Sequence, residues 1–154
     1  MQIGQVAPHI ALYNTDRKKI DLNDFKGKKV MLLFFPAAWT GVCTAEMCSV
    51  RDDISFYQKL DATVFGISVD SPFALKRFKE DQHISFDLLS DFNKQVIRAY
   101  QVYREDFICE LHGVANRAVF IIGNEGTIKY QEVLDNSGIM PDFAAAKRAL
   151  ETIQ

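Results

Sequence analysis

Residues 30–48 read Val30-Met31-Leu32-Leu33-Phe34-Phe35-Pro36-Ala37-Ala38-Trp39-Thr40-Gly41-Val42-Cys43-Thr44-Ala45-Glu46-Met47-Cys48. The apolar run over 30–35 is continuous rather than alternating, which is typical of a central strand buried on both faces. Pro36 ends this strand, and a helical pattern begins at about Thr44. Cys43 is therefore expected where a strand gives way to a helix N-terminus. Unpaired backbone N–H groups and the helix dipole stabilise a thiolate at such a place.

The segments that follow alternate between helix and strand patterns. Apolar residues recur at spacings of three and four from Thr44 to about Leu60, which predicts an amphipathic helix. The β-rich run 63–69 comes next, and Asp70-Ser71-Pro72 is an N-cap signal for a helix over 72–82. Further on, we expect a strand at 86–89 and helices at 93–100 and 142–153.

Two hairpins complete the expected sheet. One pairs 10–13 with 19–22 around an Asn- and Asp-rich turn, and the other pairs 118–122 with 127–133 around Gly123-Asn124-Glu125-Gly126. The second hairpin makes the sheet mixed, with helices on both faces. Residues 103–113 show no clear period and are expected to be irregular. The β-α-β unit followed by a β-β-α unit resembles the α/β thioredoxin fold with an added N-terminal β-hairpin.

Composition limits the classes of protein to which the chain can belong. The 154 residues are 48% apolar, which is enough for one core, so we expect a single domain over 1–154. A formal charge of −2 argues against nucleic acid or an anionic membrane as a partner. The longest apolar run is far shorter than the roughly 20 residues that span a bilayer. Residues 1–8 contain no secretory pattern, and we expect a cytoplasmic location.

The three cysteines, Cys43, Cys48 and Cys109, are an odd number, so at least one lacks an intramolecular partner. In a reducing compartment they are catalytic, redox-active or inert rather than structural disulfides. A small buried hydrophobe is the commoner state of a free cysteine, and we expect Cys109, in the irregular segment before Arg117, to be a partly buried residue without a role in the reaction. His9, His83 and His112 are scattered and show no zinc-ligand spacing, so we expect neither a metal nor another cofactor.

The pattern Pro36-x-x-x-Thr40-x-x-Cys43 at a strand-to-helix turn resembles the active-site signature of the peroxiredoxins, thiol-dependent peroxidases of the thioredoxin fold. The resemblance extends over nearly the whole chain, through Gly4-Gln5-Val6-Ala7-Pro8, Gly66-Ile67-Ser68-Val69-Asp70 and Asn116-Arg117-Ala118-Val119-Phe120. It implies that Cys43 is the peroxidatic cysteine, Thr40 its hydroxyl partner and Pro36 its shield. It also implies that Arg117 supplies a guanidinium, which would favour the thiolate and stabilise the departing oxygen. A salt bridge at a strand end is the alternative for Arg117.

Cys48 and Glu46 resemble the bacterioferritin-comigratory or PrxQ branch, in which the resolving cysteine lies five residues after the peroxidatic one. On an α-helix, five residues rotate by about 140° and rise by about 7.5 Å, so a disulfide between Cys43 and Cys48 requires local unwinding. The apolar loop 37–42 instead resembles the one-cysteine AhpE-type branch, in which an external thiol resolves. The resemblance implies that Glu46 bonds a backbone group or Arg117; the alternative is a carboxylate in the first helical turn that the dipole favours. Trp39 is expected to shield the thiol.

The sequence therefore predicts an enzyme that reduces hydrogen peroxide and organic hydroperoxides through a sulfenic acid at Cys43. Cys48 would resolve it, and a thioredoxin- or glutaredoxin-like reductant would recycle the disulfide. One alternative is a one-cysteine peroxidase, and another is a redox-sensing or holdase protein of the same fold. A disulfide reductase is less favoured, because Cys-x-x-Cys is absent. The oligomeric state is left open between monomer and homodimer.

Overall fold

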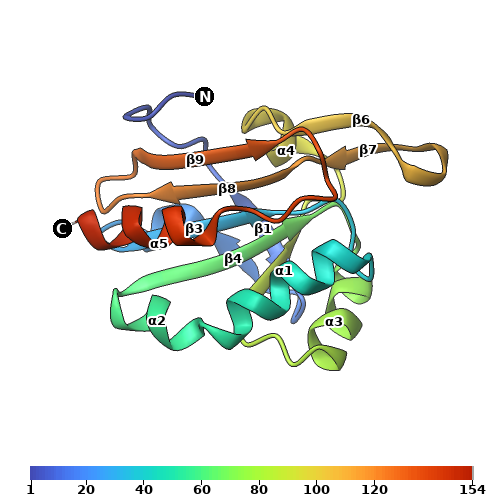
Figure 1. Cartoon of the computed structure of the whole chain (residues 1–154), viewed down its shortest axis with the longest axis horizontal. Coiled ribbons are helices and arrows are strands. Elements are labelled where there is room, and N and C mark those ends of the chain that lie inside the picture. Colours follow the sequence, from blue (N-terminus) through green and yellow to red (C-terminus); the bar gives the residue numbers. More distant parts are fainter. Residues whose placement is uncertain (154) are drawn as a thin grey trace.

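The central sheet of the computed structural model has the strand order β2-β1-β5-β4-β3-β8-β9, and the structure describes residues 1–153 (Figure 1). Its strands are β1 (Ala11–Asn14), β2 (Lys19–Asp21), β3 (Lys29–Phe34), β4 (Ala62–Ser68), β5 (Asp87–Ser90), β8 (Arg117–Ile122) and β9 (Ile128–Leu134). The three strands β3, β4 and β5 are parallel, whereas β8 runs antiparallel to both β3 and β9. The mixed sheet and both predicted hairpins are confirmed.

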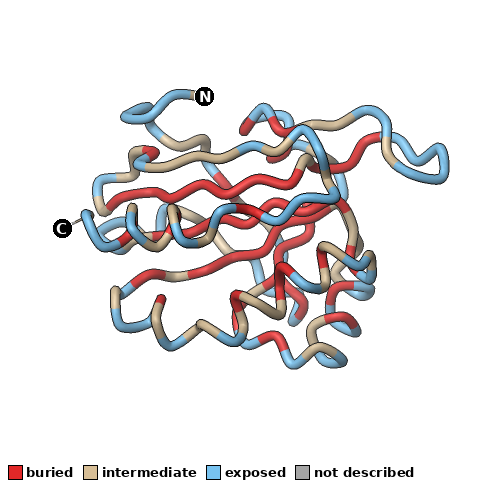
Figure 2. Tube along the Cα trace, viewed as in Figure 1, coloured by how far each residue is buried: buried red, intermediate tan, exposed pale blue. Residues whose placement is uncertain are grey.

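Helices cover both faces of this sheet. They are α1 (Gly41–Asp52), α2 (Ile54–Lys59), α3 (Pro72–Asp81), α4 (Gln95–Ala99) and α5 (Phe143–Thr152), with a 3₁₀ turn η1 (Leu22–Phe25). Met31 and Leu33 of β3 belong to the core that includes side chains of α1, α3 and α5. Leu32 and Phe34 alternate with them and belong to the core on the α4 side. The central strands are buried along most of their length (Figure 2), as the continuous apolar run predicts.

Gly66 lets α1 lie close against β4. A Cβ atom at this position would come 2.6 Å from Leu88 Cδ2 and 3.3 Å from Met47 Sδ. Met47 belongs to α1, so the missing side chain of Gly66 sets how near the helix with the cysteines approaches the sheet.

The predicted helix over Thr44–Leu60 is wrong at its start and in its middle. Helix α1 begins at Gly41, so Cys43 is its third residue. Glycine and β-branched valine are weak helix formers, which is why the pattern at Gly41 and Val42 did not indicate a helix. The helix ends at Asp52. Its C-cap is Asp53, whose N–H donates to the carbonyls of Ser49 and Val50, and α2 starts at the next residue.

The prediction that residues 103–113 are irregular is also wrong. They form most of a hairpin, β6 (Tyr103–Phe107) and β7 (Leu111–Ala115), which projects from the body of the protein (Figure 1). Its turn, η2 (Ile108–Glu110), has Cys109 and Glu110 at φ near +60°. Glycine or asparagine usually marks such positions. Because neither residue is present, and because charged residues interrupt the alternation in β6, the hairpin left no sequence signal.

In the described part of the chain, no helix combines the length and the apolar character that crossing a bilayer requires.

Candidate active site

Cys43 and Arg117 are 74 positions apart in the chain and in direct contact in the fold. Phe34, the last residue of β3, pairs with Ala118 of β8, so the end of β3 lies beside the start of β8. Only a few residues separate the end of β3 from the start of α1. Cys43, in the first turn of α1, therefore also lies near the start of β8. Arg117 Nη2 donates to Cys43 Sγ at 3.1 Å. Both residues are buried, with exposed fractions of 1% for Arg117 and 0% for Cys43.

Glu46 lies on the same buried stripe of α1 as Cys43, because the two residues are three positions apart on one helix. Its Oε2 accepts a hydrogen bond from Arg117 Nη1 at 2.5 Å. Its Oε1 is buried and has no hydrogen-bond partner in the structure. Burial raises the pKa of Glu46 to about 7, and the charge of Arg117 offsets only part of this effect. Glu46 therefore titrates close to neutral pH.

Arg117 is held in place by four hydrogen bonds. Besides those to Cys43 and Glu46, its Nε and Nη2 donate to the carbonyl oxygen of Ser137 at 3.1 and 2.9 Å. Burial alone would lower the pKa of Arg117, but its interactions with Glu46 and Cys43 raise it above its ordinary value. A guanidinium has five N–H donors, and one of those on Nη1 is not used by these four bonds.

The loop between β3 and α1 carries the remaining residues of the signature. Pro36 is buried. Thr40 is the N-cap of α1, and its hydroxyl donates to the carbonyl of Ala37 at 2.9 Å. Because the hydroxyl donates its proton to that carbonyl, its oxygen can act only as a hydrogen-bond acceptor toward other groups. Trp39 is half-exposed, and its ring packs edge-on against Phe78 of α3 at 5.3 Å between centroids. The expected shielding of the thiol by Trp39 is therefore partial at most.

The N-terminus of α1 adds backbone donors beside the sulfur. The Thr44 N–H makes the first helical hydrogen bond, to the carbonyl of Thr40 at 2.9 Å. The N–H groups of Gly41, Val42 and Cys43 precede that bond, so they have no acceptor within the helix. Together with the guanidinium, they make this a favourable environment for an anion on or next to Sγ.

Cys48 is half-buried on α1, and its Sγ contacts Gln82 Oε1 of the α3 C-terminus at 3.5 Å. Cys43 and Cys48 lie on one uninterrupted helix, and all three cysteines are free thiols. A direct disulfide between these two positions is incompatible with an intact α1.

Cys109 is exposed at the tip of the β6–β7 hairpin. This contradicts the prediction of a partly buried residue, which rested on the wrong expectation for that segment. Within residues 1–153, no three or more His, Cys, Asp or Glu side chains lie close enough together to hold a metal ion.

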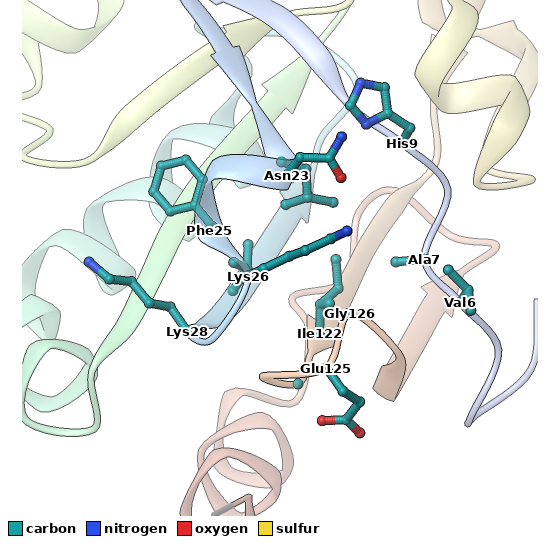
Figure 3. A pocket seen from close by; sticks show the side chains of 13 residues that line it. Val6, Ala7, His9, Asn23, Phe25, Lys26, Lys28, Ile122, Glu125 and Gly126 are labelled. Atoms are coloured by element: carbon teal, nitrogen blue, oxygen red, sulfur yellow. The ribbon is translucent and has the colours of Figure 1, made fainter.

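A pocket of about 430 Å³ lies at the opposite end of the sheet from Cys43. It is lined by Val30 and Ile122, which pair at the start of β3 and the end of β8. Figure 3 shows the Lys26 side chain extending into it between Asn23 and Gly126. None of the cysteines and no part of Arg117 lines this pocket, so it is separate from the thiol site.

Two contacts of the site were missed from the sequence. The carbonyl of Ser137 comes from the turn after β9, and a backbone acceptor has no side-chain signature. Asp70 was interpreted as part of the cap signal for α3 and of a segment that carries the family resemblance, with no role in the site, but its carboxylate also accepts the N–H of Ala38 at 2.9 Å. Ser71 makes the α3 cap bond, to the N–H of Ala74.

The chain is similar in sequence to known proteins. The model of the AhpC/TSA family matches residues 3–131. The chain is 34% identical to peroxiredoxin Bcp of Escherichia coli over 131 residues, which cover 84% of both proteins. It is 35% identical to peroxiredoxin Bcp of Bacillus subtilis over 130 residues, which cover 83% of this chain and 82% of that protein.

A solved structure shares the architecture. The crystal structure of peroxidoxin BcpB from Mycobacterium tuberculosis superimposes with a TM-score of 0.88 at 25% identity, covering 100% of this chain and 99% of that one. Fold, family model and curated relatives thus agree, and the chain belongs to the AhpC/TSA family as a peroxiredoxin, a thiol peroxidase of the thioredoxin fold.

Proposed function

We propose that Cys43 is the peroxidatic nucleophile of this peroxiredoxin and that Arg117, Thr40 and Pro36 complete its site. The observation that carries the proposal is the 3.1 Å contact between Arg117 Nη2 and Cys43 Sγ. A buried guanidinium that donates to sulfur favours the thiolate, which is the form that attacks a peroxide.

In the reaction, the Cys43 thiolate attacks one oxygen of hydrogen peroxide or an organic hydroperoxide. The S–O bond forms as the O–O bond breaks, and sulfur is oxidised to a sulfenic acid. The electron pair of the O–O bond stays on the departing oxygen, which takes up a proton and leaves as water or an alcohol. The negative charge that develops on this oxygen is the charge that the site must stabilise.

Two kinds of N–H donor are suited to that task, and the Thr40 hydroxyl orients the peroxide. Arg117 has one Nη1 N–H that is not used by its four hydrogen bonds, and this donor can reach a peroxide oxygen. The backbone N–H groups at the start of α1 supply further donors. The Thr40 hydroxyl, whose proton goes to the Ala37 carbonyl, can accept the O–H of the peroxide. Pro36 shields the sulfur from bulk water.

Closing the cycle requires a second thiol. We propose that Cys48 attacks the Cys43 sulfenic acid, forming the S–S bond and releasing water. Both cysteines lie on α1, so the first turns of the helix must unwind before the sulfurs can meet. If unwinding is too slow, an external thiol resolves Cys43 and the protein works as a one-cysteine peroxidase.

A thioredoxin- or glutaredoxin-like dithiol is the proposed reductant of the Cys43–Cys48 disulfide. Three free thiols, one of them exposed, suit a reducing compartment such as the cytoplasm.

The test is peroxide turnover in the presence of a thioredoxin system. Cys43→Ser should abolish turnover, whereas Cys109→Ser, the matched control at the exposed hairpin tip, should leave it unchanged. Turnover that survives Cys43→Ser would refute the assignment. One round of oxidation that stops despite excess reductant would instead indicate a redox sensor.

A further inference from the structure

The loop that leads to Cys43 is tied to the end of β4 by one carboxylate. Asp70 Oδ2 accepts the backbone N–H of Ala38 at 2.9 Å and the hydroxyl of Ser68 at 2.7 Å. Asp70 lies two residues beyond β4 and Ala38 lies four residues beyond β3. The bond therefore joins the two connections that leave neighbouring parallel strands at the same edge of the sheet.

The position of this carboxylate is itself fixed. Ser68 is fully buried, and its hydroxyl proton is directed at Asp70. The hydroxyl of Ser90, at the end of β5, donates to the backbone carbonyl of Asp70 at 2.6 Å. Hydrogen bonds from β4 and β5 thus fix the position of Asp70, and Asp70 in turn fixes the Ala38 N–H.

The loop needs such a support because its backbone is strained. Trp39, directly after Ala38, has φ = +72°, a conformation that a bulky side chain rarely adopts. Its ring contact with Phe78 engages only the side chain. Thr40 follows at once, and its hydroxyl reaches back to Ala37. The conformation of the residues on either side of Ala38 therefore depends on the hydrogen bond that its N–H makes with Asp70.

We propose that Asp70 is a positioning residue for the peroxidase reaction. It acts through the Ala38 amide and fixes the loop from Pro36 to Thr40, and with it the Thr40 hydroxyl and the first turn of α1. The inference rests on the proposed role of Cys43. The hydrogen bonds of the Asp70 carboxylate go to Ala38 and Ser68 and not to the sulfur, so we assign it a role in the geometry of the loop.

The experiment compares Asp70→Ala, Asp70→Asn and Ser71→Ala. Asp70→Ala removes the acceptor of Ala38. Asp70→Asn keeps an acceptor oxygen in the same place. Ser71→Ala is the matched control, since it removes the cap bond to the Ala74 N–H on the neighbouring residue and weakens the start of α3 while leaving the Asp70 bond to the Ala38 N–H in place.

Two readouts are measured for each variant. The first is the second-order rate constant of Cys43 oxidation by hydrogen peroxide in a single turnover. The second is the quenching of Trp39 fluorescence by acrylamide, which reports on the loop alone because Trp39 is the single tryptophan of the chain.

We expect Asp70→Ala to lower the rate constant by roughly tenfold or more, as for other misplaced reacting groups, and to make Trp39 more accessible to the quencher. Asp70→Asn should restore most of the rate and the quenching of the wild type, and Ser71→Ala should leave both unchanged. If Asp70→Ala does not fold, Ser68→Ala, which removes the hydroxyl that orients the carboxylate, should change both readouts in the same direction by less.

An unchanged rate and unchanged quenching in Asp70→Ala would overturn the inference. So would an equal loss of rate in Ser71→Ala, because a general loss of stability would then explain the effect. If the wild type itself fails to oxidise at Cys43, the proposed function fails, and the quenching of Trp39 alone decides whether Asp70 holds the loop.

Discussion

Replacing Glu46 by glutamine tests the electrostatics of the site through stability. Glu46 has an exposed fraction of 0% and bonds Arg117 at 2.5 Å, and its second oxygen is buried without a partner. Burial raises its pKa from 4.5 to about 7. In the unfolded chain the carboxyl returns to an ordinary pKa, so folding takes up a proton between these two values.

The sign and size of the effect follow from this difference. Where the folded state binds more protons than the unfolded state, the free energy of unfolding falls as the pH rises. The contribution of Glu46 is complete below about pH 4.5 and is lost as the pH rises to about 7. The pKa difference, from 4.5 to about 7, corresponds at about 1.4 kcal/mol per pH unit to roughly 3 kcal/mol.

The assay is urea unfolding at a series of pH values from 4 to 8 for the wild type and Glu46→Gln. Because glutamine does not titrate, the difference between the two curves isolates Glu46 from every other group. We expect the wild type to lose about 3 kcal/mol relative to Glu46→Gln across this range. The control is Glu151→Gln, which removes the same charge from an exposed position on α5 and should run parallel to the wild type.

Parallel curves for the wild type and Glu46→Gln would refute the reasoning. A wild type that gains stability relative to the variant as the pH rises would refute it as well. In that case the pair with Arg117 would outweigh burial.

Three further predictions concern the site and the core. Arg117→Lys should slow oxidation of Cys43 about 100-fold or more, because a compact ammonium lacks the planar fork by which Nε, Nη1 and Nη2 reach Glu46, Ser137 and Cys43; stopped-flow rates within a fewfold of the wild type would contradict this. Cys48→Ser should keep single-turnover oxidation but lose thioredoxin-dependent recycling, and full steady-state activity would indicate a one-cysteine cycle. Gly66→Ala should destabilise the protein by about 1–3 kcal/mol, because its Cβ would meet Leu88 Cδ2 of β5 at 2.6 Å and Met47 Sδ of α1 at 3.3 Å; an unchanged melting temperature would contradict the close packing of these two side chains around Gly66.

Strong local patterns made most of the fold predictable. The continuous apolar run over 30–35 predicted a buried central strand. The glycines and the asparagine of the turn over 123–126 predicted the hairpin of β8 and β9. The β6–β7 hairpin was missed because its turn uses Cys109 and Glu110 at positive φ. Only the tertiary structure reveals that choice, since neither residue type favours the conformation.

The site was predictable where side chains carry the chemistry. The spacing from Thr40 to Cys43 and the resemblance of the segment around Arg117 indicated residues that the fold does bring together at one end of the sheet. The contributions of Ser137 and Asp70 were not predictable, because each depends on a backbone group. The start of α1 at Gly41 was also hidden, since tertiary packing overrides the weak helix propensity of its first residues.

The proposed reaction begins with attack of Cys43 Sγ on the peroxide. Intact mass and peptide mapping after one equivalent of hydrogen peroxide, with a trap for sulfenic acid and with each cysteine replaced in turn by serine, test this directly. We predict that the first oxygen adds to Cys43, that a Cys43–Cys48 disulfide follows, and that Cys48→Ser retains the sulfenic acid at Cys43. First oxidation at Cys48 or Cys109, or unchanged oxidation in Cys43→Ser, would contradict the account.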